Sequence, residues 1–447
     1  MRNFFNDEIL INNKVGMDLY NHIKDLPIID YHCHLNENEI KDNIHFKNIT
    51  ELWLKTDHYK WRVMRTCGID EKYITGSGSD YEKFLAFATI MPKLVGNSIY
   101  YWAHLELKMI FDINEPLNKD NAEKIYNLCN EKLKDITTQS LLKKFKVEYL
   151  CTTDDPLSNL EGHGEYDGIT VSPTFRPDKL FTLDEEYISE LSKASKVEIN
   201  DLNSLKKALE NRLDYFISKG CKISDHGMDY LPMEDHDEEV INNIFINRKN
   251  ITEEEKIMFF SHMMRFLAKT YKEKNIIMQI HFATYRNINT KCFKNIGRDA
   301  GFDVFRNQVF TDRLAKFFDE LNNIDALPKT ILYTLNSNVL KEMIYIGESF
   351  RNVKIGPAWW VNDTLIGNRS HLETLAEYST LGTFLGMLTD SRSFSSYVRF
   401  DFFRRILADL IGSYVEKGEY DYNSALKLME DICYNNIKEF LCYREEK

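Results

Sequence analysis

From about residue 145 onward the chain repeats one pattern. A short run of β-branched and other apolar residues ends in polar residues, and a helical stretch usually follows. With one earlier run, the predicted strands number eight, at residues 27–31, 147–152, 169–175, 221–223, 276–280, 329–335, 353–355 and 384–388. Strands that alternate with helices form parallel βαβ units. Eight such units predict an α/β fold, a (β/α)8 barrel whose active site lies at the carboxyl ends of its strands.

The alternative for the same pattern is an open, doubly wound sheet. No Gly-rich phosphate loop follows any of the predicted strands, so that fold would lack its usual functional signature. Helices are expected at 14–26, 204–218, 253–272, 310–322 and 371–378, and one long helix at 120–145. Three parts follow: an N-terminal helix and first strand (1–35), a helical insertion (36–145) and the remainder of the barrel (146–447).

Charge and composition exclude several classes of protein. The net charge of −12, from 57 basic and 69 acidic residues, makes nucleic-acid binding a poor expectation, because phosphates favour a basic face. Residues 1–13 lack the pattern of a secretory signal, and no segment approaches the roughly 18 apolar residues of a membrane span. The eight cysteines are scattered without a C-x-x-C pair, which predicts reduced thiols in a cytoplasm.

Two histidines stand where the first predicted strand ends. His32 and His34 are two residues apart, so their imidazoles share one face of the strand while Cys33 points the other way. A lone histidine is more often a core or surface residue. A pair that converges inside a barrel mouth is instead typical of half a divalent metal site.

A carboxylate follows the eighth predicted strand. Asp390 should lie close to His32 and His34, because the eighth strand of a closed barrel is next to the first. In that place it could bind a metal, take a proton, or do both. The alternative is the N-cap of the next helix, since Asp is a preferred cap residue. Arg392, two residues later, could reach the same cavity.

Other candidate residues are less sharply defined. The run Asp-His-Tyr-Lys-Trp-Arg at 57–62 is either a solvated helix face or, through His58 and Tyr59, a proton-transfer pair. Arg176 follows the third strand and Arg286 the fifth. Either guanidinium could bind a carboxylate through two parallel hydrogen bonds. The alternative is that each is a structural arginine on the surface. His281, at the end of the fifth strand, is expected to point into the mouth of the barrel rather than toward the helices.

With these residues the chain resembles the uronate isomerase (glucuronate isomerase) family, a divergent branch of the amidohydrolase superfamily. The resemblance is carried by the order and spacing of eight motifs, at residues 29–34, 57–62, 96–107, 173–178, 281–303, 327–330, 359–363 and 386–393. It implies a distorted (β/α)8 barrel with a helical insertion after the first strand. The activity it implies is the interconversion of D-glucuronate with D-fructuronate, and of D-galacturonate with D-tagaturonate, in hexuronate catabolism.

The resemblance also implies roles for individual residues. One divalent ion, usually zinc, is expected at His32, His34 and Asp390. Asp390 is further expected to assist ring opening, and Tyr59 with His58 to transfer the carbon-2 proton on the way to a cis-enediol. The remaining carried-over residues are expected to contact the hexuronate, and they are Arg176, His281, Arg286, Trp359 and Arg392.

Residues 333–339 depart from the family, whose loop after the sixth strand is usually longer and often carries an arginine and an aspartate. The nearest alternative activity is that of a metal-dependent hydrolase, a deaminase or cyclic amidase of the same superfamily. The sixth strand ends in Leu335-Asn336 without a histidine ligand, which favours the isomerase. A non-catalytic sugar-acid binding protein would have lost metal ligands or arginines, and none is lost. A homo-oligomer is compatible with the sequence, which sets no number of subunits.

Overall fold

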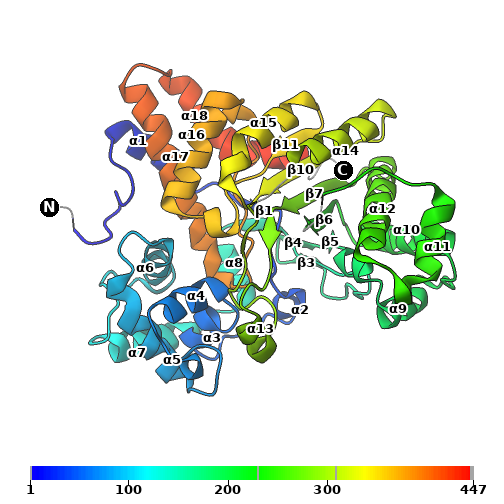
Figure 1. The fold of residues 1–447 in the computed structure, drawn as a ribbon. Helices are drawn as coiled ribbons and strands as arrows, with labels where there is room; N and C mark the ends of the chain where they lie inside the picture. Colours follow the sequence, from blue (N-terminus) through cyan, green and yellow to red (C-terminus); the bar gives the residue numbers. More distant parts are fainter. Residues whose placement is uncertain (1–2, 229–230, 308–309, 443–447) are drawn as a thin grey trace.

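Parallel strands form the centre of the molecule, and helices surround them (Figure 1). The structure is a computed structural model that describes residues 3–228, 231–307 and 310–442. Around the barrel the strands follow the order of the sequence: β1 (Ile28–Asp30), β2 (Val147–Cys151), β4 (Ile169–Ser172), β5 (Thr174–Phe175), β6 (Ile223–Met228), β7 (Ile277–Phe282), β10 (Thr330–Thr334) and β11 (Val353–Ile355). Each hydrogen-bonded pair among them is parallel. The predicted distorted (β/α)8 barrel is therefore confirmed.

The predicted strand at 169–175 is divided in two. Pro173 separates β4 from β5, and proline has no N–H to give to a sheet. The two sheets that result, β1-β2-β4-β3 and β11-β10-β7-β6-β5, stay connected because Asp154 bridges in parallel to Phe175. The short antiparallel strand β3 (Gly164–Tyr166) pairs with β4.

The prediction of an eighth strand at 384–388 is wrong. No strand is assigned to this described segment, and Gly386 within it has a φ of 76°, which is incompatible with an extended ladder. The chain directly after this segment nevertheless joins the barrel beside β1, because the N–H of Asp390 donates to the carbonyl of His32 at 3.0 Å and that of His34 to the carbonyl of Ser391 at 2.9 Å. This irregular closure is where the barrel is most distorted.

A group of helices lies between β1 and β2 in the sequence, and most of them, in blue and cyan, are at the lower left of Figure 1. They are α2 (Glu37–Lys41), α3 (Ile49–Leu54), α4 (His58–Thr66), α5 (Asp80–Ile90), α6 (Ser98–Phe111), α7 (Ala122–Leu133) and α8 (Thr138–Lys144). The single helix predicted at 120–145 is wrong. Thr137 begins a new helix with a capping box to Ser140 and pairs with His45, so the chain leaves the helical path between α7 and α8.

Most of the other helices lie around the outside of the barrel, whereas α13 lies near the helices of the insertion (Figure 1). Their bounds are α1 (Lys14–Ile23), α9 (Glu185–Ser195), α10 (Leu202–Ser218), α11 (Glu238–Ile246), α12 (Glu253–Glu273), α13 (Thr290–Ile296), α14 (Thr311–Asn323), α15 (Leu340–Ser349), α16 (Leu365–Tyr378), α17 (Val398–Glu416), α18 (Tyr422–Glu430) and α19 (Asn436–Phe440). Among the described residues no helix is both long and apolar enough for a membrane span.

Candidate active site

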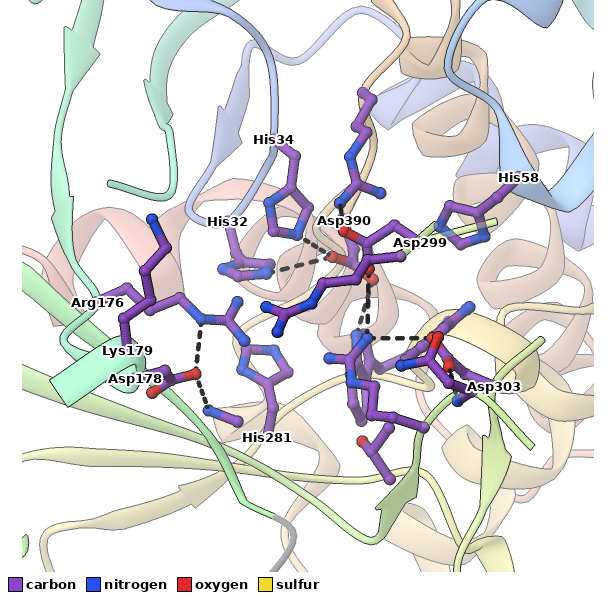
Figure 2. A pocket seen from close by; sticks show the side chains of 18 of the residues that line it. His32, His34, His58, Arg176, Asp178, Lys179, His281, Asp299, Asp303 and Asp390 are labelled. Atoms are coloured by element: carbon purple, nitrogen blue, oxygen red, sulfur yellow. Dashed lines mark hydrogen bonds and ion pairs between the residues drawn. The ribbon is translucent and has the colours of Figure 1, made fainter. Parts of the chain in front are cut away.

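A cavity of about 550 Å³ opens at the carboxyl ends of the strands. Nearly all of the residues predicted for the site line it: His32, His34, His58, Arg176, His281, Arg286, Trp359, Asp390 and Arg392. Figure 2 shows the convergence of the six that it labels, His32, His34, His58, Arg176, His281 and Asp390, from separate strands and loops. Tyr59 is the exception, because its ring lies behind the wall, stacked on that of His58 with centroids 4.7 Å apart.

Asp390 faces both His32 and His34, which follow the first strand (Figure 2). Its Oδ1 is 3.0 Å from Nε2 of His34 and 3.2 Å from Nε2 of His32. Burial alone would raise the pKa of Asp390, but hydrogen bonds with His32 and His34 hold it well below its usual range. Burial lowers the pKa of His34 to about 4. Burial would lower the pKa of His32 as well, but the charges of Asp225 and Asp390 raise it. Imidazole nitrogens and a carboxylate are ligands of divalent metals, and a metal would displace the proton from His32, so this donor set fits such an ion.

The backbone around Asp390 is held in place from both sides. Asp30, fully buried in β1, accepts from the N–H of Thr389 at 2.9 Å and from its hydroxyl at 2.5 Å. Trp359 donates its indole N–H to the other oxygen of Asp390 at 2.8 Å. The alternative role as a helix N-cap does not hold, because Ser393 occupies that position before the 3-10 turn Phe394–Tyr397.

A second group in the cavity centres on Asp225, whose role the sequence analysis missed. Asp225 is fully buried; it accepts from Nδ1 of His281 at 2.6 Å and from Nη1 of Arg176 at 2.9 Å. With Nδ1 of His281 engaged in this way, Nε2 is left as an acceptor, and this buried atom has no partner among the described residues. The predicted strand at 221–223 was too short, because β6 continues to Met228 and includes Asp225. The alternation of a buried strand puts Asp225 on the face of Ile223, and this was the available signal.

These residues form a second cluster that could hold a cation, namely His32, Asp225 and His281. However, the carboxylate of Asp225 already accepts hydrogen bonds from His281 and Arg176. Burial alone would raise the pKa of Asp225, but the charge of Arg176 and the hydrogen bond from His281 hold it well below its usual range. The guanidinium of Arg176 therefore supplies positive charge at this position, and the cluster with Asp390 is the better metal site.

Arg176 is held against the end of β6. Its Nε donates to Oδ2 of Asp178 at 2.9 Å, and the same oxygen accepts from the N–H of Gly227 at 3.0 Å. A Cβ at Gly227 would lie 2.8 Å from Nη2 of Arg176, so only glycine leaves room for the guanidinium in this position. Asp178 is a further wall residue that the sequence analysis did not assign.

The loop after β7 forms the opposite wall. It contains the small antiparallel pair β8 (Thr284–Tyr285) and β9 (Val304–Phe305). Arg286 lies 3.2 Å from Asp303 and over the ring of Trp360, and Arg392 lies 3.1 Å from Asp299. The wall residues that received no role in the sequence analysis are Lys179, Gly227, Thr284, Asn287, Phe293, Arg298, Asp299, Asp303 and Trp360.

The segment at 57–62 begins helix α4. Asp57 caps it by accepting from the N–H groups of Tyr59 at 3.0 Å and Lys60 at 3.1 Å. Lys60 is buried and lies 3.3 Å from Glu106, so the alternative of a solvated helix face is wrong. The hydroxyl of Tyr59 is buried and has no hydrogen-bond partner among the described residues, which is unusual for a buried tyrosine.

Comparison with known proteins identifies the family. The family model described as glucuronate isomerase matches residues 1–441. The chain belongs to the glucuronate isomerase family. As a glucuronate isomerase it is an enzyme, an intramolecular aldose–ketose isomerase, and the resemblance found in its sequence is confirmed.

The similarity to individual members of the glucuronate isomerase family extends over nearly the whole chain. The uronate isomerase of Clostridium acetobutylicum is 41% identical, over 98% of this chain and 99% of that protein. That of Brachyspira hyodysenteriae is 42% identical, over 98% of each. A crystal structure of the Thermotoga maritima uronate isomerase superposes with a TM-score of 0.95 at 35% identity and covers 98% of this chain and all of its own.

Proposed function

We propose that this glucuronate isomerase interconverts D-glucuronate with D-fructuronate, and D-galacturonate with D-tagaturonate, by proton transfer through a cis-enediol. The observation that carries the proposal is one cavity in which an ionised carboxylate between two imidazoles faces several arginines. The hydroxyls and the aldehyde of a hexuronate can bind at the carboxylate and the two imidazoles, and its carboxylate can bind the arginines. The overall charge of −12 makes such local cations necessary for an anionic substrate.

We further propose one divalent ion, Zn²⁺, at His32, His34 and Asp390. When bound, it would hold and polarise oxygen atoms of the sugar. The support is the convergence of the three ligand atoms, which all lie within 4.8 Å of one another. Histidine nitrogen and carboxylate oxygen are ligands that zinc accepts.

In this proposal the arginines and His281 orient the substrate. Arg176 binds the substrate carboxylate, because two of its nitrogens are held by Asp178 and Asp225 and its Nη2 has a further donor to offer. His281, with Nδ1 engaged by Asp225, presents its free Nε2 to a sugar hydroxyl. The remaining contacts come from the other wall of the cavity, from Arg286, Trp359 and Arg392.

Proton transfer is assigned to groups on either side of the cavity wall. Asp390 is ionised and takes the hydroxyl proton at carbon 1 when the sugar ring opens. Asp390 passes that proton on to the ring oxygen that is released. Burial lowers the pKa of His58, which lines the cavity, so that its neutral imidazole takes the proton from carbon 2 and returns it to carbon 1. A proton moves at the same time from the hydroxyl at carbon 2 to the oxygen at carbon 1, so that the cis-enediol is formed and consumed without change in total charge. Burial raises the pKa of Tyr59 well above its usual value. Tyr59 therefore enters as a phenol. Because its hydroxyl lies behind the wall, it acts on the substrate through His58, whose ring is stacked on that of Tyr59 and lines the cavity.

The test uses purified protein of known metal content with D-glucuronate, D-galacturonate and, as a control without a carboxylate, D-glucose. NMR in deuterated water should show fructuronate and tagaturonate with deuterium at carbon 1, and no turnover of glucose. Formation of ketose without deuterium would still support the isomerase activity. It would mean that the hydrogen moves as a hydride, or as a proton that does not exchange with solvent. No turnover of either uronate by protein with metal at His32, His34 and Asp390 would contradict the proposal.

The hydrolase alternative is not favoured by the family. Locally, β10 is followed by Leu335 and Asn336, and the side-chain amide of Asn336 donates to the carbonyl of Arg306 at 3.1 Å. The cytoplasmic location and the homo-oligomeric state stay predictions.

A further inference from the structure

Arg399 is a buried arginine outside the cavity that touches several parts of the site at once. It projects from α17, is 2% exposed, and donates from Nη1 to the carbonyl of Thr389. The face of its guanidinium lies over two rings, with centroid distances of 4.2 Å to Trp102 and 5.0 Å to Tyr59. Its Nε lies 3.6 Å from Oδ2 of Asp363.

The contact with Thr389 acts on the peptide that carries Asp390. The N–H and hydroxyl of Thr389 are both bound by Asp30, and Arg399 takes the carbonyl on the other side. Asp390 itself has a φ of 46°, a left-handed conformation that costs free energy for a residue other than glycine unless its surroundings hold it. Arg399 is part of what holds it.

The contact with Tyr59 acts on the second residue to which proton transfer is assigned. The Tyr59 ring lies between His58, 4.7 Å away and nearly parallel, and Trp102, 5.9 Å away and edge-on. Its hydroxyl makes no hydrogen bond among the described residues, so packing against these rings and the guanidinium of Arg399 sets its direction. A cation over the face of a phenol is also attracted to the ring.

Only a guanidinium can make both contacts together. It is planar, so it donates hydrogen bonds in its plane while its faces stack on rings, whereas the ammonium of lysine is a point charge. Its one ion-pair partner in the described structure is Asp363 at 3.6 Å, and a buried pair of this kind often contributes little to stability compared with apolar residues. Stability alone therefore explains Arg399 poorly.

We propose that Arg399 is a positioning residue that holds the Tyr59 ring and the Asp390 backbone in a set geometry for proton transfer. The inference rests on the proposed function, because it takes both residues as the groups that act on the substrate. Misplacement of a reacting group by about 1 Å can lower turnover by roughly 100-fold. Arg399 does not touch the cavity itself, so its loss should affect turnover much more than binding.

The experiment compares Arg399→Lys with Arg405→Lys on the same helix. Arg405 is also buried, and it pairs with Asp401 at 2.6 Å and with Tyr20 at 2.7 Å, facing α1 instead of the site. Both variants should lose thermal stability. For Arg399→Lys we expect kcat for D-glucuronate to fall by roughly 30-fold with KM within about threefold, and for Arg405→Lys an unchanged kcat. A kcat for Arg399→Lys within twofold of the wild type would overturn the proposal.

A double-mutant cycle separates positioning from a general structural effect. If Arg399 acts in part through Tyr59, then Arg399→Lys should lower kcat by clearly less in a Tyr59→Phe background than the roughly 30-fold expected in the wild type. Full additivity of the two losses would overturn the proposal, as would a Tyr59→Phe variant with normal turnover. If Arg399→Lys does not fold, Asp363→Asn in the same cycle replaces it. That variant should lower kcat by about fivefold, and its effect should likewise be smaller in the Tyr59→Phe background. An unchanged kcat would contradict the proposal for Arg399.

The wild-type protein distinguishes this proposal from the proposed function. If it forms no ketose from either uronate, the function itself has failed, and Arg399 has no reaction to support. If it forms ketose while the cycle is additive, the isomerase stands and only the positioning role of Arg399 is lost.

Discussion

Among the arginines that line the cavity, Arg298 differs from the others in its charge pairing. Arg176, Arg286 and Arg392 each have a carboxylate partner within 3.2 Å. No ion pair or hydrogen bond reaches the side chain of Arg298 within the described ranges, although it belongs to the wall. A free cation beside the site of an acidic enzyme should attract an anionic substrate over a distance that depends on salt.

Arg298→Ala should therefore raise KM for both uronates by about three- to tenfold at low ionic strength, with kcat unchanged. The charge-conserving control, Arg298→Lys, should keep most of the affinity. Steady-state kinetics at low and high salt provide the measurement, and the difference in KM should shrink at high salt. A loss of kcat instead of affinity would place Arg298 in the chemistry rather than in capture.

A second residue-scale expectation concerns pH and stability. His104 is 2% exposed in α6; its Nδ1–H donates to the carbonyl of Tyr100 at 2.8 Å, and its Nε2 accepts from the N–H of Leu117 at 3.0 Å. Burial lowers its pKa from 6.5 to about 4, against the smaller opposing effect of the Tyr100 bond. The neutral ring thus stabilises the fold fully above pH 6.5, and this contribution is lost as the pH falls toward 4, because the unfolded chain then binds the proton more readily.

Between pH 8 and pH 5 this histidine should remove roughly 2 kcal/mol from the free energy of unfolding. His104→Gln keeps an acceptor near the position of Nε2 but cannot take up the proton. Urea unfolding at both pH values should therefore show a smaller loss for the variant than for the wild type. Equal losses in the two proteins would mean that other groups account for the acid sensitivity.

At the scale of elements, the segment at 384–388 shows how one residue changes the path of the chain. Gly386 has a φ of 76°, and a Cβ there would lie 2.2 Å from the carbonyl oxygen of Ile432. Its own carbonyl accepts from the hydroxyl of Tyr31 at 2.9 Å, which ties the segment to the end of β1. The position of Asp390, four residues further on, depends on this path.

Gly386→Ala should lower the free energy of unfolding by at least about 2 kcal/mol, from backbone strain together with the clash. Gly418→Ala is the matched control: its φ is 74°, but a Cβ there would meet nothing within 4 Å. Urea unfolding of the two variants separates the two contributions, and only Gly386→Ala should also reduce turnover. Equal stabilities would show that the segment can move away from Ile432 at little cost.

At the scale of the whole molecule, the proposed metal site joins the two ends of the barrel. His32 and His34 follow the first strand, whereas Asp390 lies more than 350 residues later, in the segment that closes the ring. An ion bound by all three would link the N-terminal and C-terminal parts of the barrel in the folded state only, and such binding adds to stability.

Removal of metal with a chelator should accordingly lower Tm as well as activity, and one equivalent of Zn²⁺ per chain should restore both. His34→Gln, which removes one ligand, should melt near the chelated wild type and respond little to the chelator. Metal content by elemental analysis and thermal unfolding give the two readouts. A Tm that does not change when the metal is removed would contradict the idea that the ion closes the barrel.

Features that depend on neighbours along the chain could be predicted from the sequence. Buried strands are apolar runs whatever surrounds them, so seven of the eight predicted runs overlap described strands of the barrel. His32 and His34 could be paired because alternation along a strand is local. Likewise the lack of a Gly-rich phosphate loop, which counted against the doubly wound sheet, and the acidic net charge can be determined from the sequence alone.

Only the tertiary structure decided the partners of charged groups that are far apart in the sequence. Asp225 meets Arg176 across 49 residues and His281 across 56, and Arg399 reaches Tyr59 from the far end of the chain. The same holds for Gly386, whose carbonyl accepts from Tyr31 and where a Cβ would clash with the carbonyl oxygen of Ile432. The sequence by itself determined the barrel, because hydrophobic periodicity is a short-range property. It also determined which residues have side chains that can take part in chemistry. Which of those residues meet was left to packing, because distances between side chains exist only once the barrel has closed.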